Sequence, residues 1–266
     1  MFDHIIIGQY VPGESVIHRL DPRVKLTAVL IFLVFMFMTR DLLLLAVSFL
    51  LAFGGLVLSR VPLGFYLKGM KFISIIIIFT FMLHLFMTSG GRVLLELPFV
   101  TIYSAGVMEG AMIALKLTMI ITMASLLTLT TTPIDLTDGM ERMLSPLNRF
   151  KAPTHELALM MSIALRFIPT LLEETKTIIH AQMARGANFS EGSLWNRIKA
   201  LIPILVPLFA QSFKRAEDLA TAMEARGYAG GEGRTKFRQL TWTMKDTFVL
   251  VVFIAYGIVI LAEQFF

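Results

Sequence analysis

Residues 26–58 read LTAVLIFLVFMFMTRDLLLLAVSFLLAFGGLVL, two apolar runs that are separated only by Arg40 and Asp41. Together the runs are too long for one helix across a hydrocarbon core of about 30 Å, so they predict a hairpin of two short membrane spans, 26–39 and 42–58. Three further spans are expected, at about 72–88, 105–131 and 245–266. The sequence therefore predicts an all-α membrane protein with five transmembrane helices.

The composition supports membrane insertion and excludes several classes of protein. The chain has 266 residues, of which 56% are hydrophobic and 16% are charged, and its mean hydropathy is +0.74. Soluble globular domains carry about 25% charged residues. Five spans of about 20 residues use only about 100 positions, so most of the chain has another task. Since the chain has no cysteine, disulfides, thiol catalysis and thiolate metal sites are excluded.

The 24 Lys and Arg residues are distributed unevenly between the connections. The outer connections hold only Arg40 and Arg92, Lys116 lies within the fourth span, and fifteen lie between positions 133 and 246. Because positive residues are retained on the cytoplasmic side, the N-terminus and the long segment are expected inside and the C-terminus outside. This segment carries twelve acidic residues as well and has no basic stripe interleaved with aromatics, so no nucleic-acid partner is expected.

The long segment divides the sequence into a transmembrane region at 1–132, a cytoplasmic module at 133–244 and the last span. Its helices are expected at about 133–145, 154–186 and 194–227. The two longer ones carry apolar residues at helical spacing but are too polar for spans, so they should pack on each other and on partners. Pro169, Pro203 and Pro207 favour bends, either as fixed curvature or as hinges.

Both long helices end alike, in Ala184-Arg185-Gly186 and in Ala225-Arg226-Gly227. Capping alone explains one such end, because glycine suits the left-handed position after a helix and arginine suits the last turn. The repeat favours a second interpretation. Each arginine extends from the tip of an apolar ridge with small residues beside it, which suits docking of the helix into a groove on a partner.

Other functions find weaker support in the sequence. Glu109 and Lys116 share a face of the fourth span, and a stand-alone secondary transporter that uses them is the alternative hypothesis. No phosphate-binding loop of the Gly-x-x-x-x-Gly-Lys type occurs, and the five histidines show no ligand spacing. We therefore expect a non-catalytic protein with no metal site and no cofactor of its own.

The chain resembles the T component, the transmembrane scaffold, of energy-coupling factor transporters, which import vitamins and metal ions in prokaryotes. The resemblance rests on Leu20-Asp21-Pro22-Arg23-Val24-Lys25-Leu26, on Arg166-Phe167-Ile168-Pro169, on both Ala-Arg-Gly ends and on the layout of spans. It covers nearly the whole chain, and the paired Ala-Arg-Gly ends are its most specific part.

The resemblance implies a multi-pass protein of a prokaryotic cell membrane in which the two long helices are coupling helices. Arg185 would dock on one ABC-type ATPase and Arg226 on another, with ATP bound by these partners. The early part of the third inner helix would face the membrane and a substrate-binding S component through Ile198, Leu201, Leu205, Phe209 and Phe213. The substrate, and whether the scaffold is shared or dedicated, stay open, because substrate contacts would belong to the S component.

Overall fold

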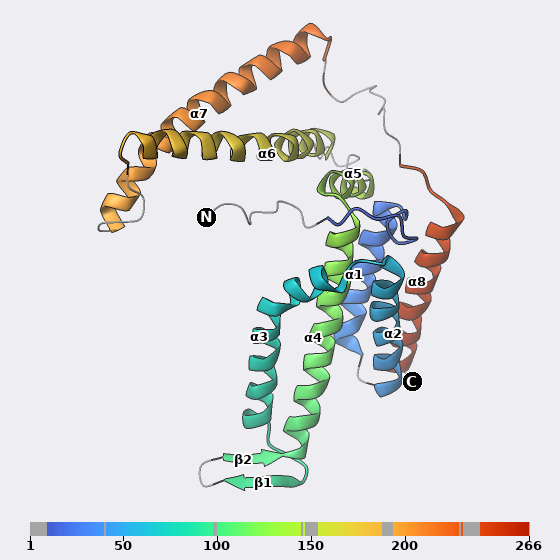
Figure 1. The fold of residues 1–266 in the computed structure, drawn as a ribbon. Coiled ribbons are helices and arrows are strands. Elements are labelled where there is room, and N and C mark those ends of the chain that lie inside the picture. The colour runs from blue at the N-terminus through green and yellow to red at the C-terminus, as the bar shows by residue number, and fades with distance from the viewer. Residues whose placement is uncertain are drawn as a thin grey trace. The chain divides into compact units, whose positions relative to one another are not determined.

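The computed structural model describes residues 10–39, 41–97, 100–144, 146, 154–187, 194–228, 230 and 240–265. Its elements, in chain order, are α1 (Pro22–Met38), α2 (Leu42–Ser59), α3 (Leu63–Met87), β1 (Val93–Leu97), β2 (Val100–Tyr103), α4 (Ser104–Thr130), α5 (Pro133–Leu144), α6 (Thr154–Ala184), α7 (Leu194–Ala225) and α8 (Met244–Phe265) (Figure 1). The predicted fold class, an all-α membrane protein, is confirmed.

The chain forms two compact units. The first, here called the spanning unit, consists of Gly8–Met140 and Leu240–Phe266 and contains α1 to α4 and α8. The second, the long-helix unit, consists of Met1–Ile7 and Glu141–Gln239 and contains α6 and α7. In the sequence the long-helix unit lies between α4 and α8. The last helix, α8, therefore packs in the same unit as the first helices.

Four of the described helices, α2, α3, α4 and α8, are long and apolar enough to cross a membrane. The helix over the first expected span, α1, has 17 residues and measures about 26 Å at 1.5 Å per residue. That is a little less than a hydrocarbon core of about 30 Å. The fifth span, at 26–39, therefore stays a prediction.

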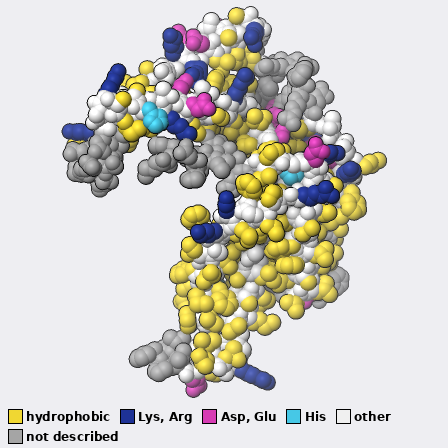
Figure 2. Space-filling model, in the orientation of Figure 1, with side chains coloured by type: hydrophobic (Ala, Val, Ile, Leu, Met, Phe, Trp, Pro, Cys, Tyr) yellow, Lys and Arg dark blue, Asp and Glu magenta, His cyan; other side chains and the backbone are white. Residues whose placement is uncertain are grey.

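The core of the spanning unit lies between α1, α2, α4 and α8. Phe32 and Met36 of α1, Met119 of α4 and Ile260 of α8 are at most 1% exposed. Many other apolar side chains of these helices point outward, and Figure 2 shows them covering the visible surface of the unit. In a bilayer these outward side chains face lipid, so apolar residues serve both the inside and the outside of this unit.

The helices α3 and α4 pack along a pair of glycines, Gly106 and Gly110, that are one turn apart. A Cβ atom added at Gly106 would lie 2.8 Å from the carbonyl oxygen of His84, and one added at Gly110 would lie 3.3 Å from that of Phe81. Small residues at this spacing allow close helix approach in membranes. The α3–α4 pair therefore depends on the absence of side chains at two positions.

The helix α3 begins at Leu63, nine residues before the expected span at 72–88. Lys68 and Lys71 lie in this earlier part. Lysine is a good helix former although it is unfavourable in lipid, so hydropathy indicates where a helix enters the membrane rather than where it begins. This helix is therefore longer than the span that its hydropathy predicts.

The connection between α3 and α4 contains an antiparallel hairpin of β1 and β2, which the sequence analysis did not predict. Leu97 pairs with Val100, and the register shifts between Val93 and Leu95. A two-stranded hairpin of this length is marginal on its own, and its apolar residues do not alternate clearly enough to indicate strands. The hairpin adds no sheet core to the fold.

In the long-helix unit, α6 and α7 have 31 and 32 residues and pack against each other. Among their described side chains only Ala158 and Ile204 are buried. Two helices of this length thus leave most of their apolar surface outside the contact that they share.

Candidate functional site

The end of α6 is closed by a Schellman motif. The amide of Gly186 donates to the carbonyl of Met183 at 2.9 Å, and the amide of Ala187 donates to the carbonyl of Gln182 at 3.0 Å. Gly186 has a φ of 88°, in the left-handed region that glycine adopts without strain. These two bonds are the 5→2 and 6→1 bonds of the motif, so the chain turns away directly after Arg185.

The end of α7 repeats the same geometry. The amide of Gly227 donates to the carbonyl of Glu224 at 2.9 Å, and the amide of Tyr228 donates to that of Met223 at 3.0 Å. The φ of Gly227 is 75°. The left-handed glycine that each Ala-Arg-Gly sequence predicts is therefore confirmed at both helix ends.

Both helix tips are open to the surroundings. Every residue of the two Ala-Arg-Gly sequences is exposed, namely Ala184, Arg185, Gly186, Ala225, Arg226 and Gly227. A Cβ atom added at either glycine would meet no atom within 4 Å. Each tip therefore presents a guanidinium, with its planar set of donors, next to a small surface that a partner's backbone can approach closely.

The contact between α6 and α7 contains an ion pair of Glu174 and Arg215. The guanidinium of Arg215 also lies over the ring of Phe167, 5.7 Å from its centroid. Nearer to the end of α6, Gln182 Nε2 donates to the carbonyl of Pro203 at 3.4 Å. The ion pair is partly buried, with 32% of the Arg215 side chain and 22% of the Glu174 side chain exposed. It is thus shielded better than an ordinary surface pair.

From this contact to its Ala-Arg-Gly end, each helix has a segment of the same length, here called its arm. Arg185 follows Glu174 by eleven residues, and Arg226 follows Arg215 by eleven residues, so each tip lies about 16 Å along its helix from the ion pair. The helices run antiparallel, because Gln182 contacts a position well before Arg215 (Figure 1). The two arginines therefore lie toward opposite ends of the crossed pair.

The apolar residues expected to face a membrane partner lie on α7. Five of them are 45–74% exposed, namely Ile198, Leu201, Leu205, Phe209 and Phe213. Their spacing of three or four residues places them on one stripe of the helix. Such a stripe is far more apolar than an ordinary solvated helix face.

The sequence Leu20 to Leu26 fastens the start of α1 to the start of α8. The carboxylate of Asp21 caps α1 by accepting from the amide of Arg23 at 2.9 Å, and it pairs with the guanidinium of Arg23 at 2.8 Å. The amide of Asp21 donates to Asp246 Oδ1 at 2.8 Å. Asp246 Oδ2 accepts from the amide and the hydroxyl of Thr243 at 2.7 and 2.6 Å. Asp246 is fully buried, so these bonds are not shared with water.

Lys25, in the same sequence, ties α1 to the end of α4. Its ammonium donates to the carbonyl of Thr130 at 2.9 Å, to Thr131 Oγ1 at 3.2 Å and to the carbonyl of His18 at 3.1 Å. Only 6% of Lys25 is exposed. The sequence around Lys25 therefore has a structural task that its family resemblance alone did not explain.

The residues of the alternative hypothesis lie on α4. Glu109 is exposed, between the two glycines of the α3–α4 contact. Lys116 donates a hydrogen bond to the carbonyl of Thr39, directly after α1. Lys116 thus links two helices, as a structural residue does.

Metal binding finds no support in the described part of the chain. There, no group of three or more His, Asp and Glu side chains is placed to hold a metal ion. Of the histidines, His84 contacts the carbonyl of Thr80 at 2.9 Å through Nδ1, one turn earlier on its own helix.

The ion pair of Glu174 and Arg215 is not predicted by the sequence. Its two members are 41 residues apart, the same spacing that separates Arg185 from Arg226. This shared spacing is no signal of contact, because the helices are antiparallel and the same spacing places the two arginines far apart, and an acidic residue on one helix and a basic residue on another are too common to single out.

Comparisons with known proteins agree with the observed fold. Residues 13–237 match the model of the CbiQ family, described as cobalt transport protein. The chain is 77% identical over 265 residues to the energy-coupling factor transporter transmembrane protein EcfT of Bacillus selenitireducens, with 100% of this chain and 99% of that protein covered. It is 53% identical to the EcfT of Bacillus subtilis, with 94% and 95% covered. Against the EcfT of Listeria innocua the identity is 50%, with 94% and 95% covered.

Proposed function

The chain belongs to the CbiQ family and, within it, is a transmembrane protein of the energy-coupling factor transporter kind, so we propose that it transmits the motion of two ATPase subunits to a substrate-binding membrane subunit. It is a multi-pass membrane transport protein. In this proposal it carries no catalytic residue and no cofactor, and the partners bind and hydrolyse ATP.

One observation carries the proposal: two helices end in the same exposed Ala-Arg-Gly cap, with the same hydrogen bonds, on opposite arms of one crossed pair. A cap that served stability alone would not need an exposed arginine at both ends. Arg185 docks in a groove of one ATPase and Arg226 in a groove of the other, where a planar guanidinium makes paired bonds to carboxylates or carbonyls. Ala184 and Ala225 let the groove wall come close.

In this proposal, the ion pair of Glu174 and Arg215 is the crossing point through which the two helices transmit motion. With about 16 Å from the pair to each tip, the arms hold the two docking points apart and transmit their displacement to the crossing point. When the ATPases close on ATP, the tips move with them, and the angle between α6 and α7 changes.

The exposed stripe of α7, from Ile198 to Phe213, receives the substrate-binding subunit in this proposal. Its residues are too apolar to face water, and they lie on the part of α7 that precedes the ion pair. A change of the helix angle therefore moves this surface and releases the substrate inward. The tips and the long-helix unit are cytoplasmic, the C-terminus lies outside, and vitamins or other micronutrients are the expected substrates.

The test is the double variant R185E/R226E in the complete transporter. Removing one member of a buried charge contact costs about 3–5 kcal/mol, so each reversed charge should weaken docking by about 100-fold or more. Co-purification of the ATPases and ATP-dependent uptake should both be lost. The variant K176E/K214E is the matched control, because it makes the same charge change at mid-helix positions of α6 and α7.

The control should keep the ATPases bound. Undiminished uptake by R185E/R226E would refute the docking proposal. The alternative of a stand-alone transporter makes a separate prediction, because the chain alone in vesicles would then move substrate along an ion gradient and E109Q would stop it.

A further inference from the structure

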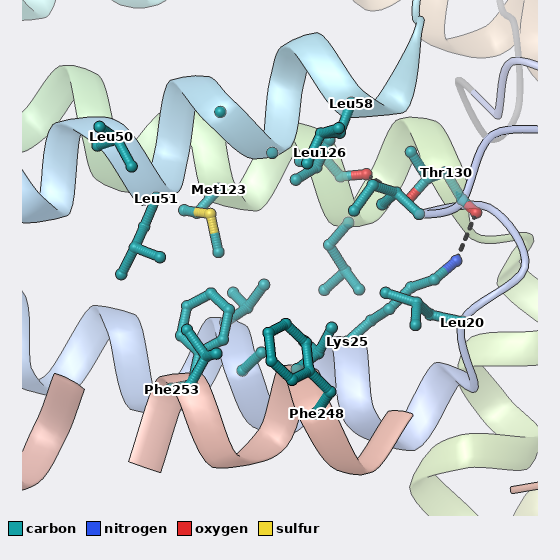
Figure 3. A pocket seen from close by; sticks show the side chains of 18 residues that line it. Leu20, Lys25, Leu50, Leu51, Leu58, Met123, Leu126, Thr130, Phe248 and Phe253 are labelled. Carbon is teal, nitrogen blue, oxygen red and sulfur yellow. Dashed lines mark hydrogen bonds between the residues drawn. The ribbon is translucent and has the colours of Figure 1, made fainter. Parts of the chain in front are cut away.

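The spanning unit contains an apolar cavity of about 280 Å³ between α1, α2, α4 and α8 (Figure 3). Leu50 of α2 and Phe248 of α8 line it and are 71% and 70% exposed, so the cavity opens to the surface between these two helices. All its described walls belong to the spanning unit. The medium at its opening is therefore the bilayer.

The lining has almost no polar groups. Of the eighteen lining residues, sixteen are apolar or glycine, and the other two are Lys25 and Thr130. Figure 3 shows the ammonium of Lys25 at one end of the cavity, where it donates to the carbonyl of Thr130 at 2.9 Å. The cavity thus has an apolar body and a cation at one end.

We propose that this cavity holds an acyl chain of an anionic phospholipid. Acyl chains are the apolar molecules that surround an opening between two membrane-spanning helices, and part of one chain can enter an apolar lining of this kind. The proposal is independent of the docking of Arg185 and Arg226.

The charges at this end of the unit favour an anionic headgroup. Arg60 lies two residues after the lining residue Leu58, and Lys245 lies three residues before Phe248, so exposed cations flank the opening on both helices. The three acceptors of the Lys25 ammonium are neutral oxygens. Of the acidic groups nearby, Asp21 is paired with Arg23, Asp246 accepts bonds from the backbone and from Thr243, and Asp135, which also acts on the charge of Lys25, accepts from the hydroxyl of Thr132.

Gly54 offers a way to fill the cavity without disturbing the packing. It lines the cavity, and a Cβ atom added there would meet no atom within 4 Å. In the variant G54F the ring has open space to enter. Gly64 of α3 also meets nothing within 4 Å but is not part of the lining, so G64F is the matched control.

The experiment uses the full chain in phosphatidylcholine vesicles with a small fraction of phosphatidylglycerol that carries a photoreactive group on one acyl chain. After illumination, mass spectrometry maps the labelled peptides. We expect labelling of residues 50–58 and 248–253 that falls by about fivefold or more in G54F and is unchanged in G64F. Labelling of α3 should be equal in all proteins, which shows that G54F is folded.

A second comparison tests the headgroup. Phosphatidylcholine with the same photoreactive chain should label the cavity several-fold less, and R60E/K245E should remove this difference. Equal cavity labelling of the parent chain and G54F would overturn the proposal, as would equal labelling by the two lipids. Loss of the cavity labelling in the complete transporter would show that a protein partner fills the opening, which would also overturn it.

Discussion

The spanning unit and the long-helix unit contain similar apolar side chains, but they use them differently. In the spanning unit, residues of α1, α2, α4 and α8 enclose a core in which Phe32 and Met36 have no exposed surface. In the described parts of α6 and α7, only Ala158 and Ile204 are buried. One unit encloses an apolar core, whereas the other leaves most of its described apolar side chains exposed.

The polar groups of the two units also differ in how far they are buried. Asp246 and Lys25 of the spanning unit are buried and make three hydrogen bonds each to neighbouring segments. Arg185 and Arg226 of the long-helix unit are exposed. The lesson is that buried polar groups hold a unit together, while the exposed ones at the two identical helix ends are those to which the proposed function assigns docking.

The largest stability effect should come from Asp246. The variant D246A leaves the buried amide of Asp21 without its acceptor, at about 1–3 kcal/mol, and also removes the acceptor of the part-buried Thr243 amide and hydroxyl. Together we expect a loss of about 3–5 kcal/mol, measured as thermal unfolding in detergent. The control D218A, at an exposed position of α7, should stay within about 0.5 kcal/mol. Equal stability of the two variants would show that the units do not differ in this way.

A smaller effect is expected at the ion pair of the long-helix unit. E174Q removes the charge opposite Arg215, and since the pair is partly buried the loss should be about 1–2 kcal/mol, more than an exposed pair provides. Hydrogen exchange of the amides of α6 near Glu174 measures it. The swapped variant E174R/R215E should recover part of this loss. If E174Q exchanges like the parent chain, the ion pair does not hold the helices.

The smallest effect should come from the two cap glycines. G186A and G227A place a Cβ atom at a positive φ, which costs about 1 kcal/mol although no neighbour is struck. ATPase affinity should fall by about fivefold, and exchange of the Ala187 and Tyr228 amides should be faster. The control G64A lies within a helix and should stabilise it slightly. Unaltered exchange in G186A and G227A would show that these caps are not needed.

The sequence predicted much of the fold because hydropathy and capping act locally. The apolar runs indicate α2, α4 and α8, and the glycines after Arg185 and Arg226 indicate left-handed caps. Each of these signals lies within a few residues of the structure that it predicts.

The remaining features depend on contacts between distant segments. The hydrogen bond from Asp21 to Asp246 joins positions 225 residues apart, and the local sequence around either residue does not indicate its partner. The same is true of Glu174 with Arg215 and of Gly106 with the carbonyl of His84. The sequence therefore indicated which residues of the candidate site are exposed tips, but not the crossing that sets their separation.

The central claim is that the two arginine tips dock on two different ATPase subunits. Because the chain has no cysteine, A184C and A225C each introduce one thiol beside an arginine, where a short thiol-to-amine cross-linker reaches the docked subunit. Mass spectrometry of the assembled transporter identifies the cross-linked chains, with M160C, at an exposed position of α6, as the control. We predict that A184C and A225C cross-link to separate ATPase subunits and that M160C does not. Cross-links from both tips to the substrate-binding subunit, or to no protein, would contradict the account.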